Sequence, residues 1–170
     1  MSKKFSSPAS PKSLPYAFVM LCSSNTEDEC FQKCLLGCPV NGKILEFLGN
    51  ENNSLLKPGT PIILFNFDTS VAYVNIFATS CMKKNIDSTA YNGQFPCQIR
   101  VDVSRVGWCL ADDNYKWKGR MKAGSWLTKL EYMKWFDRVP WEESKWYQEQ
   151  QEQLKMDGEK IETPERKKRN

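Results

Sequence analysis

The sequence has no histidine among its 170 residues. Histidine is the usual general base near neutral pH, it activates serine and cysteine nucleophiles, and it is a frequent ligand of zinc. An enzyme built from this chain would depend on carboxylate, lysine or thiolate chemistry alone. The sequence therefore predicts a binding protein and not an enzyme.

A recognisable metal motif is also missing, although the chain has seven cysteines. Cys30, Cys34 and Cys38 recur every four residues, but tetrahedral zinc needs four ligands and no Cys-x-x-Cys pair completes the set. Cysteine is also a common small buried residue. We expect reduced thiols, and neither a metal nor a cofactor.

Long apolar runs are absent as well. No segment approaches the roughly 20 apolar residues that cross a bilayer, and residues 1–15 lack the apolar centre of a secretory signal. An odd number of cysteines without such a signal is typical of an intracellular protein. We expect a cytoplasmic or nuclear protein without membrane contact, and the basic, serine-bearing start leaves a mitochondrial address open.

What the chain does have is enough apolar material for a packed core, since 41% of its residues are hydrophobic and 12% aromatic. This length suits one domain with extensions. We predict a flexible basic Ser/Pro arm at 1–15, a folded domain at 16–138, and a charged, partly helical tail at 139–170. Polar ends of this kind are typical of segments that become ordered on a partner, so we expect protein partners at the arm and the tail.

The first elements of the domain follow from its hydrophobic pattern. The apolar run at 16–21 predicts a buried strand. Thr26 with Glu29 three positions later predicts a capping box for a helix over 27–36, which we expect to end at Gly37.

Later elements follow from the same reasoning. Residues 61–67 and 71–79 predict a β-hairpin, and the alternation of apolar and polar residues at 97–106 predicts a half-buried strand. A helix is predicted at 125–136. Its apolar face is expected to consist of Trp126, Leu127, Leu130 and Met133.

Four motifs carry a resemblance to a known family. They are Cys22-x3-Thr26-x2-Glu29-Cys30 leading to Leu36-Gly37-Cys38-Pro39; Pro58-Gly59 followed by Leu64-Phe65-Asn66-Phe67-Asp68; Tyr73 through Ala78-Thr79-Ser80; and Asn85-Ile86 followed by Ala90-Tyr91-Asn92-Gly93-Gln94-Phe95-Pro96-Cys97-Gln98-Ile99-Arg100. By these motifs, which cover about residues 16–106, the chain resembles the plant development and cell death (DCD) domain family. Val74 departs from the pattern, because the family usually has glycine there.

The resemblance implies an α+β fold: a PUA-like small open β-barrel or curved mixed sheet with flanking helices, to which the charged helical tail is added. It also implies a relation to the YTH and EVE modules, which read modified bases or RNA, and no catalytic activity.

The same resemblance implies a candidate base pocket. In the YTH modules the corresponding turns and strand end converge on a methylated base, and flipped bases are held by polar groups and an aromatic face. The matching residues here are Cys22, Ser23, Ser24, Asn25, Gly37, Cys38, Asn66 and Phe67. The structural alternative is that Asn25, Thr26 and Glu29 cap a helix and Phe67 belongs to the core.

A second candidate is a basic segment interleaved with aromatic residues, which could neutralise phosphates while stacking unpaired bases. Its residues are Tyr115, Lys116, Trp117, Lys118, Arg120 and Lys122, and the terminal cluster Arg166, Lys167, Lys168 and Arg169 is a further phosphate-binding candidate. The alternative is a solvated charged face. The sequence thus predicts contact with RNA or a ribonucleoprotein, and a protein-interaction module in stress or cell-death signalling remains the other interpretation.

Overall fold

The structure is a computed structural model that describes residues 14–40, 56–111 and 121–158. Within these residues the strands are β1 (Ala17–Cys22), β2 (Leu35–Cys38), β3 (Pro61–Asn66), β4 (Val71–Ala78), β5 (Lys83–Lys84), β6 (Cys97–Asp102), β7 (Gly107–Leu110) and β8 (Trp126–Leu127). The helices are α1 (Glu27–Lys33), α3 (Lys129–Phe136) and α4 (Lys145–Asp157), with short 3-10 turns η2 (Ala90–Gly93) and η3 (Trp141–Glu143). The predicted α+β class with a curved, open mixed sheet and flanking helices is confirmed.

The sheet runs in the order β2-β6-β4-β3-β1-β8, while β5 pairs with β6 and β7 pairs with β4. Strands β1 and β3 are parallel, and the other pairs are antiparallel. Because β2 and β8 stand at the two ends of this path, the sheet does not close into a barrel.

Strand β1 explains how one sheet serves two cores. Successive side chains of a strand point to opposite faces, and here both faces are covered. Phe18 and Met20 enter one apolar cluster with Leu35 and Leu36. Val19 enters a second cluster with Trp135. A strand buried on both faces reads as a continuous apolar run, which is why the sequence predicted it correctly.

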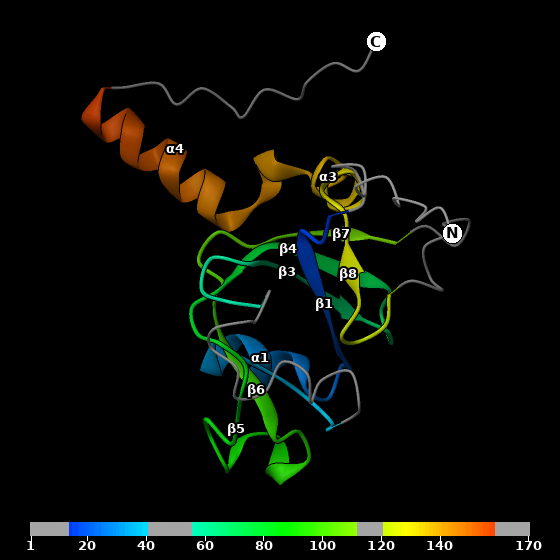
Figure 1. Cartoon of the computed structure of the whole chain (residues 1–170). Helices are drawn as coiled ribbons and strands as arrows, with labels where there is room; N and C mark the ends of the chain where they lie inside the picture. The colour runs from blue at the N-terminus through cyan, green and yellow to red at the C-terminus, as the bar shows by residue number, and fades with distance from the viewer. Residues whose placement is uncertain (1–13, 41–55, 112–120, 159–170) are drawn as a thin grey trace, which may run out of the picture.

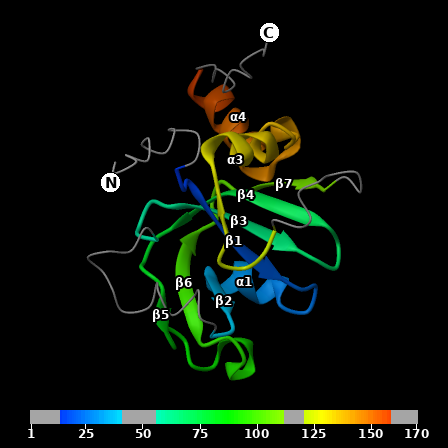
Figure 2. The same ribbon diagram turned by 45° about the vertical axis from the view of Figure 1, so that its right-hand side comes forward.

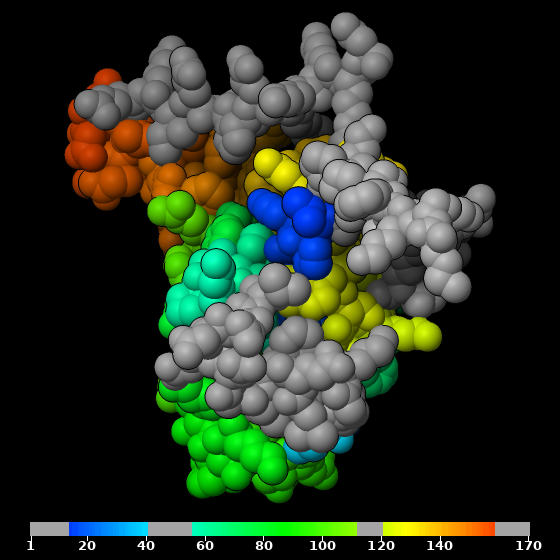
Figure 3. Space-filling model, in the orientation of Figure 1, coloured from blue at the N-terminus to red at the C-terminus, as the bar shows by residue number. Residues whose placement is uncertain are grey.

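The two clusters place the helices on opposite faces. In both ribbon views α3 lies on one side of the strands β1, β3 and β4, and α1 lies on the other (Figures 1 and 2). Helix α4 extends from one corner of the molecule (Figures 1 and 3). The molecule is therefore a sheet between two unequal helical layers.

Strand β4 changes partner halfway along its length. Its first half pairs with β7 and its end pairs with β6. Asn75 lies between these halves with a φ of 63°, and its side-chain amide donates a hydrogen bond to the carbonyl of Arg105 at 2.9 Å. Asparagine tolerates this left-handed backbone better than most residues, so the turn between β6 and β7 can pass beside β4.

The predicted hairpin at 61–67 and 71–79 is confirmed as β3 and β4. The predicted helix over 27–36 is wrong at its end. It stops at Lys33, Cys34 takes a left-handed conformation with a φ of 47°, and the chain continues as β2. Pairing with β6 and the burial of the two leucines of β2 override the local helical pattern.

The predicted capping box at this helix is also wrong. Thr26 caps no helical amide with its side chain; its Oγ1 instead accepts a hydrogen bond from the backbone N–H of Ser23 at 3.1 Å. Glu29 accepts one from the backbone N–H of Tyr91 at 2.9 Å. The glutamate is thus used for a tertiary contact with a distant loop.

Two further predictions need correction. The strand at 97–106 ends at Asp102, and the chain turns before β7. The helix at 125–136 begins only at Lys129, after a capping box formed by Thr128 and Glu131. The expected apolar face is therefore shifted, because β8 takes Trp126 and Leu127, and Leu130 is exposed. Tyr132 and Trp135 form the buried face instead.

Packing continues beyond residue 138. Val139 and Trp141 are buried in the second cluster, and Trp146 packs against it. Trp146 belongs to the helix α4, none of whose residues is fully buried. None of the helices in the described ranges is long and apolar enough to cross a membrane.

Candidate functional site

A cavity of about 360 Å³ lies where the two ends of the open sheet approach each other. Its wall combines β2 from one end of the sheet with β1 and the loop before β8 from the other end. Two loops, after β3 and around η2, supply three aromatic rings. The lining residues are Leu21, Cys22, Ser23, Thr26, Cys30, Gly37, Cys38, Pro39, Phe67, Tyr91, Phe95 and Ala123. We call this cavity the edge pocket.

Five of the eight predicted base-pocket residues line the edge pocket: Cys22, Ser23, Gly37, Cys38 and Phe67. The other three are not among its lining residues. Ser24 and Asn25 are exposed in the turn after β1, and the N–H of Ser24 donates a hydrogen bond to Asp68 at 2.9 Å.

Asn66, the third, is fully buried and organises the turn after β3. Its Oδ1 accepts hydrogen bonds from the backbone N–H groups of Asp68 at 2.9 Å and Thr69 at 3.2 Å. Its Nδ2 donates to Glu27 at 3.3 Å. Asn66 therefore holds the turn that presents Phe67, whose side chain is 56% exposed at the pocket.

Sequence reasoning missed the two rings supplied by the η2 loop, Tyr91 and Phe95. They belong to the motif at 85–100, the last of the four that carry the family resemblance. Their ring centroids lie 5.5 Å apart in an edge-to-face arrangement. The two aromatic residues of this motif were the sequence signal that could have identified them as pocket residues.

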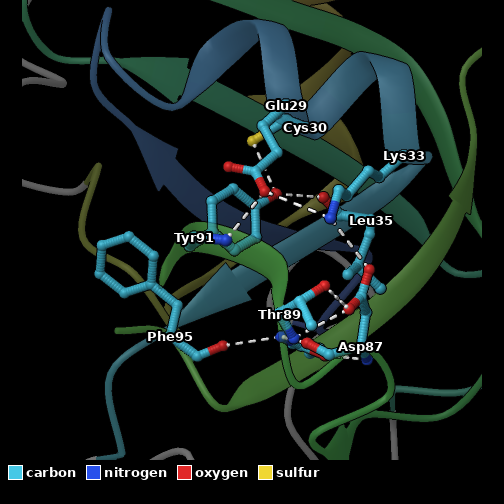
Figure 4. A network of polar contacts seen from close by, with 9 residues as sticks. Glu29, Cys30, Lys33, Leu35, Asp87, Thr89, Tyr91 and Phe95 are labelled. Atoms are coloured by element: carbon cyan, nitrogen blue, oxygen red, sulfur yellow. Dashed lines mark hydrogen bonds and ion pairs between the residues drawn. The ribbon is translucent and has the colours of Figure 1, made fainter. Parts of the chain in front are cut away.

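The η2 loop is fixed by a polar network that Figure 4 shows from close by. The Glu29 carboxylate accepts the Tyr91 backbone N–H, and Lys33 bridges Glu29 at 3.4 Å and Asp87 at 3.0 Å. Asp87 accepts hydrogen bonds from the backbone N–H of Thr89 at 2.9 Å and from its hydroxyl at 2.6 Å. Helix α1 is thereby tied to a loop about sixty residues further along the chain.

Gln98 completes this network from strand β6. Its side chain donates hydrogen bonds to the carbonyls of Asp87 at 2.9 Å and Phe95 at 3.1 Å, and it accepts the Asp87 N–H at 2.7 Å. Gln98 is buried, and hydrogen bonds are electrostatically stronger in the low-dielectric interior than in water. The loop is held at both of its ends.

Such restraint is needed because the loop backbone is strained. Tyr91 and Asn92 have φ values of 54° and 52°, a region that non-glycine residues rarely adopt. Such conformations persist only where the surrounding structure determines them. Here the Tyr91 hydroxyl is also hydrogen-bonded to the carbonyl of Leu35 and lies 3.2 Å from Cys30 Sγ.

The ionisable groups around the pocket are shifted by these contacts. Hydrogen bonding to Thr89 holds the pKa of Asp87 well below its usual range, and hydrogen bonding to Asp87 raises the pKa of Lys33. Burial raises the pKa of Tyr91 and raises that of Cys38 to about 12. The network is therefore charged and paired, while the phenol and this thiol in the pocket wall stay neutral at physiological pH.

The predicted basic segment reaches the pocket wall at its last residue. Lys122 is exposed and is the chain neighbour of Ala123, which lines the pocket. The adjacent Gly124 is held against β1 by a hydrogen bond from its N–H to the carbonyl of Val19 at 2.9 Å. The remaining residues of both basic predictions lie outside the described residues: Tyr115, Lys116, Trp117, Lys118, Arg120, Arg166, Lys167, Lys168 and Arg169.

A metal centre finds no support in residues 14–40, 56–111 and 121–158, because no group of three or more cysteine or carboxylate side chains there could hold an ion. All seven cysteines fall in these ranges, and all are free thiols.

Comparison with known proteins matches residues 16–120 to the family model described as the development and cell death domain. The chain belongs to this family. A relative from Glycine max, named DCD domain-containing protein NRP-A, is 27% identical over 126 residues, which cover 67% of this chain and 32% of that protein. A relative from Daucus carota, named B2 protein, is 24% identical over 128 residues, covering 68% of this chain and 58% of that protein.

The DCD chain thus matches less than two thirds of the length of either relative. No solved structure matches it significantly. The edge pocket lies within the matched region, since its lining residues other than Ala123 fall between residues 16 and 120.

Proposed function

We propose that this DCD domain is a non-catalytic module that takes an unpaired RNA base into the edge pocket, with the adjoining phosphates at Lys122 and the basic segment before it. The names of the family and of its relatives point to a non-enzymatic domain. The observation that carries the proposal is a concave, aromatic-lined cavity whose wall includes Ala123, the chain neighbour of the exposed Lys122.

The cavity has the size and lining of a ligand site. Pockets for small molecules and cofactors usually measure about 300–1,000 Å³ and have mostly apolar walls with a few polar groups. Three rings (Phe67, Tyr91 and Phe95) offer faces or edges to a flat guest. Ser23 and the backbone of β2 supply polar atoms nearby, so a base could be both stacked and hydrogen-bonded.

Charge directs where an RNA backbone would run. Glu27 and Asp68 act electrostatically on Cys22 at the end of β1, so phosphates are repelled from that part of the rim. Lys122 attracts them beside Ala123. This uneven rim favours one neutral base in the cavity and the backbone on the lysine side.

The proposal also includes the PUA-like relation, which the open curved sheet supports in outline. A protein-interaction role is the second candidate. It is favoured by the exposed apolar side chains of Trp108 and Leu110 on β7, because exposed apolar side chains of this kind often mark contact surfaces.

Changing Phe67 to alanine distinguishes RNA binding in the edge pocket from the protein-interaction role. We expect Phe67→Ala to weaken binding of a fluorescein-labelled, mixed-sequence single-stranded RNA by about 5- to 150-fold in fluorescence anisotropy, since stacking is worth about 1–3 kcal/mol per base. Affinity of the unchanged protein should also fall as salt rises.

The matched control is Trp108→Ala, which removes an aromatic side chain of similar exposure, 51% against 56%. Trp108 is on β7 and is not a pocket-lining residue. This control should bind RNA like the unchanged protein. RNA binding that is absent at low salt, or lost equally in both variants, would count against the pocket and favour the protein-interaction role.

A further inference from the structure

A groove of about 370 Å³ lies beside the start of β1, separate from the edge pocket. The half-buried rings of Tyr16 and Trp126 form two of its sides, and the turn at residues 57–61 forms most of the rest. Figure 3 shows the start of the described chain (blue) next to this turn (teal) and to the segment before α3 (yellow), on one face of the molecule. We call this hollow the second groove.

Both rings of the second groove are held from behind by other aromatic side chains. Trp126 packs edge-to-face against Phe18, with ring centroids 5.1 Å apart. Tyr16 packs against Tyr132 with a centroid distance of 5.5 Å. Phe18 and Tyr132 are buried, one in each apolar cluster. Walls that are held in this way lose little side-chain freedom when a flat guest enters, which favours stacking.

The turn that closes the second groove is also held in place. The Lys57 N–H donates a hydrogen bond to Thr60 Oγ1 at 3.1 Å, and the Thr60 N–H donates one to the carbonyl of Lys57 at 3.0 Å. Gly59 has a φ of 92°, which glycine adopts without strain, and its N–H donates to the carbonyl of Ala78 at 2.8 Å. The exposed Lys57 side chain is therefore presented from a fixed backbone.

The charge around the second groove is positive. Lys57 lines it, and the Nζ of Lys129 lies 5.8 Å from the centroid of the Tyr16 ring. None of the described residues that line the groove is acidic. Two ammonium groups beside two aromatic rings suit a guest that combines a flat ring with a phosphate, and a nucleotide is such a guest.

One short piece of chain joins the second groove to the edge pocket. Ala123 lines the edge pocket and Trp126 lines the groove. Three residues of chain span at most about 11 Å, so the two sites are neighbours. The piece between them is held along β1, because the Gly124 N–H donates to the carbonyl of Val19 and the Val19 N–H donates to the carbonyl of Ser125, both at 2.9 Å. One strand of RNA can therefore reach both sites.

We propose that the second groove is a further base-stacking site for the same RNA strand, where a base stacks on the two rings while the two lysines neutralise phosphates. The strand leaves the edge pocket past Lys122 and follows residues 123–126 to the start of β1. This second site rests on the proposed function, since it requires RNA to be the ligand.

The salt dependence of RNA binding tests the two lysines. Each phosphate that a protein neutralises on a single strand contributes about 0.7 to the slope of log K against log salt concentration. Removing two such contacts with Lys57→Gln and Lys129→Gln in one variant should make that slope shallower by about 1.4. The probe is a fluorescein-labelled, mixed-sequence single-stranded RNA of ~12 nucleotides, within the usual site size of single-strand binding folds. Both side chains are exposed, so the fold should be kept.

The matched control combines Lys145→Gln and Lys155→Gln. It removes the same charge from two exposed lysines of α4, and neither of them lines the second groove or the edge pocket. Helix α4 extends from one corner of the molecule (Figure 1). The salt slope of this control should equal that of the unchanged protein.

Trp126→Leu tests the stacking surface. Leucine keeps an apolar side chain against Phe18 but removes the aromatic face, so we expect affinity to fall by about 5- to 150-fold with the salt slope unchanged. Urea unfolding shows whether the variant keeps its fold. The lysine variant, which changes no core residue, decides the question if it does not.

The outcomes separate the second groove from the edge pocket. If Phe67→Ala weakens binding while the Lys57/Lys129 variant keeps the original affinity and slope, the proposed function stands and the second groove is wrong. If the groove variants weaken binding and Phe67→Ala does not, the groove is supported and the edge pocket is contradicted. An equal change of slope in the α4 control would overturn the groove as a specific site. Absence of RNA binding by the unchanged protein at low salt would contradict both sites.

Discussion

Trp135→Ala is expected to lower the free energy of unfolding by about 3–5 kcal/mol, the range seen when a large buried side chain is truncated in a core. Trp135 is 1% exposed and joins α3 to the second face of the sheet, against residues of β1, β3 and β7. Its removal leaves a void that backbone elements on both sides would have to close. Urea unfolding followed by circular dichroism measures the loss.

Trp108→Ala is the control for this prediction. Both substitutions remove an indole, but the Trp108 side chain is 51% exposed, and exposed substitutions usually change stability by less than about 0.5 kcal/mol. Equal effects of the two variants would show that α3 is not packed on the sheet as described.

Gly37→Ala is expected to damage the edge pocket and to cost about 1–3 kcal/mol of stability, as overpacking usually does. A Cβ on Gly37 would lie 2.9 Å from the Cβ of Phe95, 3.1 Å from the Tyr91 ring and 3.2 Å from the Phe95 carbonyl oxygen. Two of these three atoms belong to the start of a side chain or to the backbone, so no simple rotation relieves the contact. The η2 loop must shift.

The predicted readouts are a lower urea midpoint and weaker binding of the RNA probe. Val40→Ala is the comparison, because Val40 lies just beyond β2 and its side chain is 40% exposed. That variant should leave both measurements unchanged. If Gly37→Ala kept normal stability and binding, the close approach of Phe95 to β2 would be wrong.

Elements with an unambiguous local pattern could be predicted from the sequence. The apolar run of β1 and the hairpin of β3 and β4 are examples. Nearly every residue of β1 is buried, and every second residue of β4 is buried, so each pattern can be read from a single strand. Thr128 with Glu131 was present as a true capping box. Thr26 with Glu29 has the same spacing and is not one, because Glu29 instead accepts the Tyr91 N–H and pairs with Lys33.

The parts that could not be predicted depend on contacts between distant segments. Leu35 and Leu36 continue a helical pattern, and only their pairing with β6 makes them a strand. The η2 loop comes to the pocket because Asp87 meets Lys33 and Gln98. No local sequence pattern indicates such long-range contacts. The sequence therefore predicted the pocket residues at the end of β1, in β2 and after β3, and missed Tyr91 and Phe95.

Photochemical cross-linking is the most direct test of whether an RNA base occupies the edge pocket. A single-stranded RNA substituted with thiouridine is bound to the reduced chain, irradiated and mapped by mass spectrometry. We expect cross-links to peptides that contain Phe67, Tyr91 or Phe95. Cross-links found only outside the pocket wall, under conditions where the RNA is bound, would contradict base binding in this pocket.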